Sequence, residues 1–237
     1  QAFRIYHANS LDDTGMAQLG CSPQEDRHKA LRQIPHFLVI GNPPYSKNSR
    51  NLSEQHKRHI EPFRYLDGEK IREKAALAHE VNLNDDYVKF FGLMNGLLRS
   101  PAAICCYITN HRYLDSRSLR GLRATLSASF PFIDLVDLGG QGSEGGPGDE
   151  NIFQISQGTC IGLFRRTSGT TDSRVRYARL RGARAQKIEH LRQPSSLLFE
   201  TIKPSPPYHH FSRNRDASSE EFDAWPSLSD IFPKNSG

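Results

Sequence analysis

Three continuous apolar runs dominate the hydrophobic pattern of the chain. The runs HFLVIG, AAICCYITN and FIDLVDLG cover residues 36–41, 102–110 and 132–139. None alternates between apolar and polar positions, as a strand with one wet face would. Continuous runs are typical of strands that a parallel sheet buries on both faces. We therefore predict that each run forms a buried strand.

Helical patterns separate these runs. Before the second run, Val88, Phe91 and Met94 fall on one stripe, and Asn84 or Asp85 can act as the N-cap. Before the third run, SLRGLRATLSASF has the pattern of a basic amphipathic helix. The order strand, helix, strand, helix, strand predicts an α/β domain with a doubly wound, Rossmann-like and mostly parallel sheet.

The remaining segments predict less regular structure. Residues 46–70 carry many charges and are expected to form a solvent-exposed insertion. Residues 139–151 form a glycine-rich loop that lacks the Gly-Lys-Ser/Thr ending of a P-loop. After this loop, IFQIS and TCIGLFRR predict a C-terminal antiparallel hairpin, and SRVRYARLRG predicts one more strand. From Lys203 onward the chain is rich in Pro, Ser and His, and we interpret it as a connector.

The charge is unevenly distributed along the chain. The net charge is only +5, but nine Arg and Lys residues against two acids lie between Arg165 and Arg192. Such a patch suits a phosphate backbone, although an ordinary solvated face has the same composition. The cysteines at 105, 106 and 160 lie in apolar runs, and no Cys/His spacing indicates a metal site. These cysteines fit a reducing cytoplasm best, so we expect a cytoplasmic protein. No apolar run approaches the roughly 20 residues of a membrane span.

The clearest chemical signal is Asn-Pro-Pro-Tyr, Asn42 to Tyr45, which directly follows the first apolar run. In a doubly wound sheet, ligands bind outside the carboxyl ends of the strands. The two prolines fix the backbone and have no N–H, so this corner presents acceptors alone, beside a flat tyrosine ring. Two acceptors placed on the hydrogens of a conjugated amine favour pyramidal nitrogen and localise its lone pair. The alternative interpretation of Pro-Pro is a simple turn.

The sequence resembles the γ-type amino-methyltransferases, which transfer methyl from S-adenosylmethionine to the N6 of adenine in DNA. It is most similar to the methyltransferase region of large single-chain restriction-modification enzymes. The resemblance covers roughly residues 3–200 and rests on a series of motifs in the order of the family. These are IGNPPYS, NLNDDYVKFF, ITNHRYLD, LRGLRATL and NIFQISQGTCIGLFRR.

The resemblance implies a role for particular residues at the target base. Asn42 accepts from the target N6 through its side-chain oxygen and Pro43 through its carbonyl, with Pro44 stiffening the corner. Tyr45 and Phe153 stack on the flipped adenine, because a base inside a duplex is out of reach. The alternative for Phe153 is a core position at the start of a strand.

The resemblance also implies cofactor and DNA contacts. S-adenosyl-L-methionine would lie against Asn42, Phe90 and the turn Asn9, Ser10 and Leu11, although the family often has an acidic residue where this chain has Asn9. The alternative for Phe90 is helix core. Double-stranded DNA is the expected partner, and its phosphates are expected to contact four arginines of the basic patch. These are Arg165, Arg166, Arg174 and Arg176.

The family's glycine-rich cofactor loop and first strands have no counterpart in this sequence. We therefore expect an internal part of a longer protein, inactive by itself. Residues 1–202 would be the C-terminal part of the catalytic domain, and residues 203–237 a connector toward a target-recognition domain. The longer protein can carry a nuclease or translocase. The alternatives are a methyltransferase for protein glutamine or RNA adenine, and a catalytically silent DNA-binding module.

Overall fold

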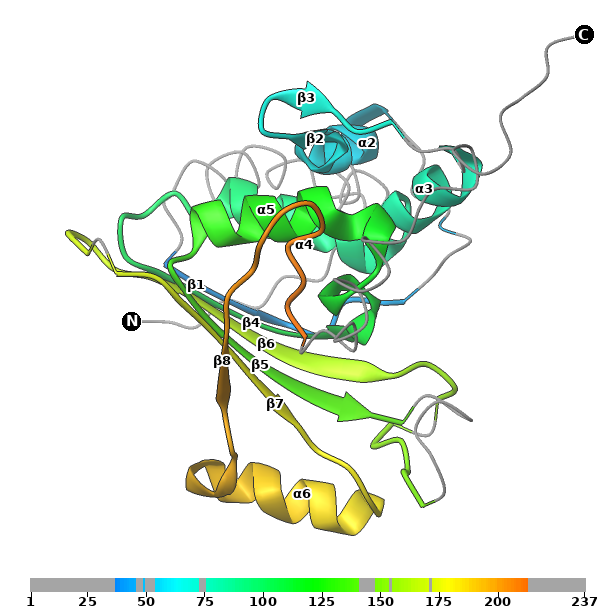
Figure 1. Ribbon diagram of the computed structural model, residues 1–237, viewed down its shortest axis with the longest axis vertical. Coiled ribbons are helices and arrows are strands. Elements are labelled where there is room, and N and C mark those ends of the chain that lie inside the picture. Colours follow the sequence, from blue (N-terminus) through cyan, green and yellow to red (C-terminus); the bar gives the residue numbers. More distant parts are fainter. Residues whose placement is uncertain are drawn as a thin grey trace, which may run out of the picture.

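A six-stranded sheet with helices on both faces forms the centre of the computed structural model (Figure 1). The structure describes residues 37–45, 49, 54–72, 76–140, 148–153, 155–170 and 172–212. The strands of the main sheet are β1 (Leu38–Gly41), β4 (Ala103–Asn110), β5 (Phe132–Gly139), β6 (Thr159–Arg166), β7 (Arg174–Arg179) and β8 (Glu200–Ile202). The α-helices are α2 (Glu54–Ile60), α3 (Ala76–Leu83), α4 (Asp86–Leu97), α5 (Arg120–Ser129) and α6 (Arg184–Arg192). The short elements are β2 (Tyr65–Leu66), β3 (Glu69–Lys70) and the 3-10 turns η2 (Glu61–Arg64), η3 (His111–Leu114), η4 (Arg117–Leu119) and η6 (Pro194–Ser196).

The strand order is β1-β4-β6-β5-β7-β8. β1 runs parallel to β4, and β5 runs parallel to β7. β6 lies between β4 and β5 and is antiparallel to both, and β8 is antiparallel to β7. Four strands thus share one direction, and the predicted mixed, Rossmann-like α/β fold is confirmed.

The antiparallel pairing differs from the hairpin predicted for IFQIS and TCIGLFRR. The described residues of IFQIS are turns and bends, and TCIGLFRR, which is β6, pairs with β4 and β5 instead. Within this segment the backbone N–H of Phe153 donates to Asn151 Oδ1, so it is not available to a strand ladder. The prediction failed because strand composition does not reveal a competing side-chain contact.

β1 is not the buried strand that its apolar sequence predicts. It lies at one edge of the described sheet, and Phe37, Leu38 and Ile40 are 67%, 44% and 72% exposed. The strand β5 follows the prediction, since Ile133 and Leu135 on one face and Leu138 on the other are buried. Its neighbour β4 follows it on one face alone, since Cys105 is fully buried but Ile104 is 41% exposed. Within the described residues, β1 therefore has a neighbouring strand on one side alone, and several of its apolar side chains stay exposed.

The helices α2 to α5 cover one face of the sheet (Figure 1). The predicted stripe of α4 is confirmed, because Val88, Phe91 and Met94 are fully buried in the main core. Asp85 occupies the N-cap position after the break that separates α3 from α4.

The segment predicted to be a solvent-exposed insertion also belongs to this layer. Most described residues of this segment are exposed, as predicted, but Ile60 and Phe63 are buried in the core, which the prediction did not foresee. Two glycines explain the close packing, because a Cβ at Gly92 would overlap the backbone of His59 and one at Gly121 would overlap that of Phe63. Helix α2 and turn η2 can therefore lie directly on α4 and α5.

The opposite face carries a smaller core under α6, a helix that the sequence pattern did not predict. Val136 and Leu138 of β5 point to this side, whereas Ile133 and Leu135 point to the main core. Leu191 of α6 packs against the smaller core, together with Phe199 near β8. The α6 segment is rich in charge and has no clear apolar stripe, which hid it from periodicity analysis.

Residues after β8 return to α5 and pack on it. Phe211 is fully buried, and the guanidinium of Arg123 donates to the carbonyl oxygens of Tyr208 and His209. The same guanidinium donates to the carbonyls of Tyr113 and Ser116, which follow β4. Burial lowers the pKa of Arg123 to about 10. Across the described part of the chain, none of the helices has the length and apolar character needed to cross a membrane.

Candidate functional site at the carboxyl edge of the sheet

The Asn-Pro-Pro-Tyr corner begins where β1 ends at Gly41. Asn42 and Pro44 are exposed, Pro43 is buried and Tyr45 is half-buried. The ring of Tyr107 lies beneath the start of this corner, because a Cβ on Gly41 would lie 3.0 Å from Tyr107 Cε1. The sequence therefore places the Asn42 amide in solvent and anchors the corner through its first proline.

Tyr45 ties the corner to the adjacent strand. Its hydroxyl donates to Asn42 Oδ1 at 2.9 Å and lies 3.3 Å from the carbonyl oxygen of Ile108 in β4. Burial raises the pKa of Tyr45 to about 12, so the hydroxyl remains a donor at neutral pH. An amide oxygen accepts two hydrogen bonds, so Asn42 Oδ1 is oriented by Tyr45 and keeps capacity for a second donor.

Tyr107 connects Phe90 to this corner. The Tyr107 hydroxyl donates to the Phe90 carbonyl at 3.4 Å, and the half-buried Phe90 ring packs on the main core. The neighbouring Phe91 is fully buried and makes an edge contact with Tyr107. Phe90 is therefore at the border of the core rather than inside it, and part of its side chain is accessible.

Phe153 lies at the same edge of the sheet as Tyr45. Its segment precedes β6, whose first residue Thr159 is opposite Asn110, the last residue of β4. Asn110 Nδ2 donates to Gln157 Oε1 at 3.0 Å, and the backbone N–H of His111 donates to Gly158 O at 3.0 Å. Phe153 is 37% exposed, so it is not the core residue of the alternative interpretation.

Two polar networks that the sequence analysis missed support this edge. Buried Asp137 accepts from Tyr177 Oη, lies 2.9 Å from His111 Nδ1 and accepts from the Gly139 N–H. Its pKa is lowered, since hydrogen bonds, led by that of His111, outweigh the opposing effect of burial. The sequence signal was polar residues where the apolar runs end, in Thr-Asn-His and Asp-Leu-Gly.

The second network joins α4 to the chain just beyond the corner. Fully buried Lys89 donates to Ser49 Oγ at 2.7 Å and lies 3.7 Å from Asp86 Oδ1. Ser49 in turn donates to Asp86 Oδ1 at 2.5 Å. Burial is the main cause of a lowered pKa at Lys89, which Asp86 opposes. The available signal was a lysine between the apolar residues Val88 and Phe90 of α4.

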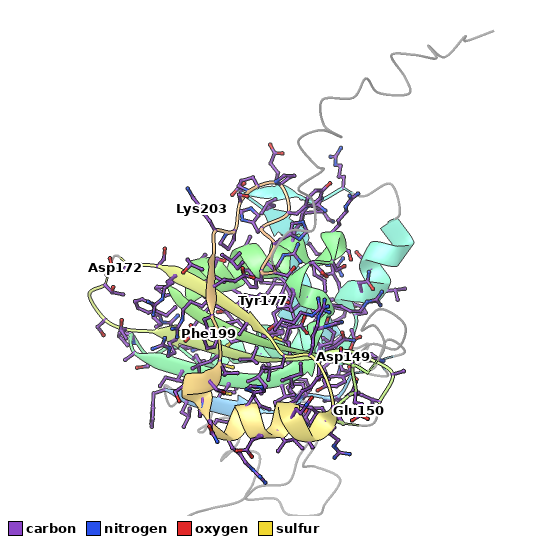
Figure 2. All side chains as sticks on the ribbon, turned by 60° about the horizontal axis from the view of Figure 1, so that its bottom comes forward. Asp149, Glu150, Asp172, Tyr177, Phe199 and Lys203 are labelled. Atoms are coloured by element: carbon purple, nitrogen blue, oxygen red, sulfur yellow. The ribbon has the colours of Figure 1, made fainter. Side chains whose placement is uncertain are left out.

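The four arginines predicted to contact DNA lie toward the opposite end of the strands, near the amino ends of β4, β5 and β7. The β6 residues Arg165 and Arg166 pair with the first residues of β4, and Arg174 pairs with Phe132 at the start of β5. An eight-residue strand separates the two edges by about 20–25 Å. In Figure 2, Asp172, just before β7, and Asp149 mark these opposite ends of the sheet.

Three of these arginines are also engaged within the fold. Arg165 and Arg176 form ion pairs with Asp134 at 3.0 and 2.6 Å. Arg166 donates to the carbonyl oxygens of Leu98, Ser100 and Ser129. Arg174 is exposed. The structure therefore brings Asn42, Tyr45 and Phe153 to one edge but does not bring this arginine cluster to them.

The remaining predicted contacts, Asn9, Ser10 and Leu11, lie outside the described residues. Among the described residues, no group of three or more His, Cys, Asp or Glu side chains could hold a metal ion.

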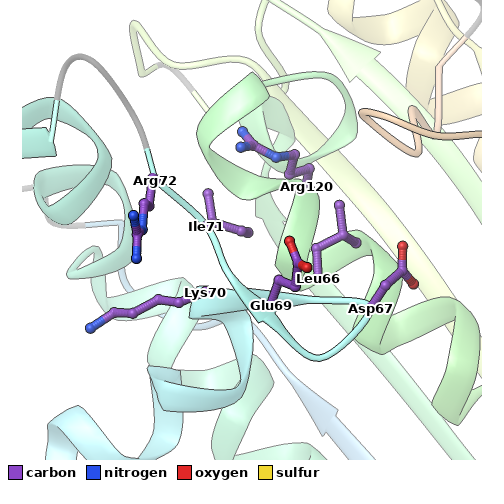
Figure 3. Close-up of a pocket in the computed structure, with 7 residues that line it drawn as sticks. All are labelled: Leu66, Asp67, Glu69, Lys70, Ile71, Arg72 and Arg120. Atoms are coloured by element: carbon purple, nitrogen blue, oxygen red, sulfur yellow. The ribbon is translucent and has the colours of Figure 1, made fainter.

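An open hollow of about 790 Å³ lies away from the predicted site, at the β2–β3 hairpin and the start of α5 (Figure 3). Three basic and two acidic side chains contribute to its lining, and none of the predicted site residues does. Its lining residues are Leu66, Asp67, Glu69, Lys70, Ile71, Arg72 and Arg120.

Comparison with known proteins gives one family and several solved structures. Residues 27–143 match the family described as Eco57I restriction-modification methylase. The ATP-dependent Type ISP restriction-modification enzyme LlaBIII bound to DNA superposes with a TM-score of 0.67 at 20% identity, over 89% of this chain. The DrdV–DNA complex and a nuclease-deletion mutant of the Type ISP enzyme LlaGI with a DNA substrate mimic each give a TM-score of 0.61, at 22% and 21% identity and over 84% of this chain. No curated protein matches the sequence.

The matched structures are much longer than this chain. It covers 15% of the LlaBIII chain and 20% of the DrdV and LlaGI chains. At these identities the likeness establishes the fold.

Proposed function

We propose, from the match of residues 27–143 to the family described as Eco57I restriction-modification methylase, that the chain is part of a DNA adenine-N6 methyltransferase. The observation that carries the proposal is the Asn42–Tyr45 corner at the carboxyl edge of a parallel strand pair. The chain acts within a larger restriction-modification enzyme. Its substrate is an adenine turned out of double-stranded DNA.

Asn42 and Pro43 act on the target amine. The Asn42 side-chain oxygen and the Pro43 carbonyl oxygen accept hydrogen bonds from the two N6 hydrogens and favour a tetrahedral nitrogen with a localised lone pair. When bound, S-adenosylmethionine supplies an electrophilic methyl group. The N6–C bond would form as the methyl–sulfur bond breaks and the neutral thioether leaves. N6 would then be cationic and would lose its proton to water without a strong base. Tyr45 orients the Asn42 oxygen through its hydroxyl.

The aromatic residues hold the flat groups. Tyr45 and Phe153 contact the two faces of the extruded base, which repays part of the few kcal/mol of unstacking. The support for one wall of a cofactor site is that the half-buried Phe90 packs on the main core and its carbonyl oxygen accepts from Tyr107, whose ring lies beneath Gly41. Asn42 and Phe90 would hold the cofactor here, with Asn9, Ser10 and Leu11 proposed from the resemblance alone.

Phosphate contact is assigned to fewer arginines than the sequence predicts. Of the four, Arg174 is exposed, whereas Arg165, Arg166 and Arg176 already bind groups within the fold. The proposal therefore includes Arg174 as a backbone contact and leaves the others as supports of the sheet. A single exposed arginine affects affinity and salt dependence rather than sequence choice.

Methyl transfer by the full-length protein tests the proposal. Labelled methyl transfer to duplex DNA, RNA and protein is measured for the wild type and Asn42→Ala, with Asn95→Ala on α4 as the matched control. We expect transfer to adenine in DNA, lost by about a hundredfold or more in Asn42→Ala, with a much smaller loss of cofactor affinity because Phe90 still contacts the cofactor. Asn95→Ala retains wild-type activity.

Each of the other outcomes would contradict one part of the proposed function. Transfer to RNA or protein but not to DNA identifies another substrate class. Duplex binding without any transfer identifies a silent module. Asn42→Ala turnover within a few-fold of wild type would show that the acceptor role is wrong.

A further inference from the structure

We infer that Asn151 is a positioning residue that fixes the exposed Phe153 ring for stacking on the target base. This inference rests on the proposed function. It adds a residue to that site which acts through Phe153 and does not itself touch the substrate. The starting observation is an exposed aromatic ring on a segment whose backbone is held from several sides.

The Asn151 side chain uses both ends of its amide. Nδ2 donates to the carbonyl oxygens of Gly140 at 3.1 Å and Gln157 at 2.7 Å. Oδ1 accepts from the backbone N–H of Phe153 at 2.8 Å. One side chain therefore links the end of β5, the residue that carries the ring and the residue two before β6.

The backbone around Asn151 leaves little space for movement. A Cβ on Gly140, whose φ is +80°, would lie 2.6 Å from the Asn151 Cα. A Cβ on Gly158 would overlap the His111 ring. The segment is thus packed against the ends of both β5 and β4.

A buried ion pair fixes the base of the segment. Lys187 Nζ lies 2.6 Å from Asp149 Oδ1, and their side chains are 0% and 3% exposed. Asp149 also accepts from the N–H groups of Gly140 and Gly182, and Lys187 donates to the carbonyls of Leu138 and Glu150. Figure 2 shows Asp149 and Glu150 together beside one end of α6. Asp149 and Asn151 are thus each tied down, two residues apart.

The ring beyond these anchors is offered to solvent. Phe153 is 37% exposed and Ile155 is 38% exposed, whereas Ile152 between the anchors and the ring is buried. Fixing the backbone that carries an exposed apolar ring does not help folding, but it lowers the ordering cost when a flat ligand binds. A misplacement of about 1 Å at such a group costs on the order of a hundredfold in rate.

A double-mutant cycle in the full-length protein tests the inference. Asn151→Asp retains an acceptor for the Phe153 N–H but sets a carboxylate against two carbonyl oxygens. We expect kcat for DNA methyl transfer to fall by about ten- to a hundredfold, with DNA affinity within about threefold of wild type. Because Asn151 acts through the ring, Asn151→Asp combined with Phe153→Ala should be no slower than Phe153→Ala alone.

The controls separate positioning from general damage. Asn95→Asp, the same change on α4, leaves kcat unaltered in both backgrounds. If Asn151→Asp does not fold, Asn151→Ala enters the same cycle. A merely structural role gives additive losses in kcat, and wild-type kcat in a folded Asn151 variant also overturns the inference.

Hydrogen exchange keeps the inference testable apart from the activity. Amides of residues 148–153 should exchange faster in Asn151→Asp, while those of β4 remain protected. If the wild type transfers no methyl group to DNA, the proposed function fails. The exchange of this segment then decides whether Asn151 fixes the ring, and unchanged exchange would show that it does not.

Discussion

The two sides of the proposed base site are built differently. The Asn42–Tyr45 corner follows the edge strand β1, where Ile40 and the preceding Phe37 are largely exposed. Among the described residues, the side-chain hydrogen bonds of the corner come from one hydroxyl. The segment from Asp149 to Gly158 is held by a buried ion pair and a bidentate asparagine. The corner thus depends on the intrinsic stiffness of two prolines, whereas the Phe153 segment depends on packing and hydrogen bonds.

The largest expected effect is on the packed side. Lys187→Met leaves Asp149 buried without its cation, so unfolding free energy should fall by about 3–5 kcal/mol. Urea unfolding of the variant and the wild type measures this change. Arg174→Met, which removes an exposed cation, is the control and should stay within about 0.5 kcal/mol. A loss below about 1 kcal/mol in Lys187→Met would mean that the pair does not support the segment.

The next comparison makes the same substitution on each side. In Gly158→Ala the new methyl group meets the His111 ring, so we expect a loss of about 1–3 kcal/mol. In Gly41→Ala the methyl group lies 3.0 Å from Tyr107 Cε1, which can move slightly, so the loss should be below about 1 kcal/mol. Equal losses in urea unfolding would remove the proposed difference between the sides.

The smallest effect concerns the corner itself. Tyr45→Phe retains the ring but loses the bonds to Asn42 and Ile108, which should cost about 0.5–1.5 kcal/mol at neutral pH. The pKa of Tyr45 is raised to about 12, above the value of about 10 in an unfolded chain. Below pH 10 both states keep the proton, and between pH 10 and 12 the unfolded state alone releases it.

The stability of the wild type relative to Tyr45→Phe should therefore be constant below pH 10 and decline as pH approaches 12. Urea unfolding at a series of pH values measures the difference, in which the other tyrosines cancel. A difference that does not change up to pH 12 would show that the Tyr45 hydroxyl is not shielded from water.

Local patterns predicted where several elements lie. The α4 stripe follows from helical spacing, β4 and β5 follow from continuous apolar runs, and the corner could be located because a strand ends at two prolines. Contacts between distant residues could not be read this way. The tertiary fold brings Lys187 next to Asp149 and Arg176 next to Asp134. Counting charges along the sequence therefore suggested a basic patch, although these basic side chains form ion pairs.

Because contacts between distant residues cannot be read from local patterns, the burial of Ile60 and Phe63, before α3, was not predicted. Ile60 and Phe63 are isolated apolar residues among charges, which is the composition of a surface loop. They are buried because Gly92 and Gly121 let α2 and η2 approach the helices closely, and the two glycines lie far from them in sequence. The burial of Ile60 and Phe63 thus depends on the lack of a side chain at Gly92 and Gly121.

The carbonyl oxygens that accept hydrogen bonds from the Arg123 guanidinium have a practical consequence for where this chain can be shortened. A truncation after Ile202 would remove the Tyr208 and His209 carbonyls and the fully buried Phe211 side chain. The guanidinium would then keep its bonds to Tyr113 and Ser116 but lose the rest of its acceptors inside the protein. A protease nick between β8 and Phe211 should therefore loosen the turn after β4, and a soluble shortened protein should be designed to end beyond Phe211.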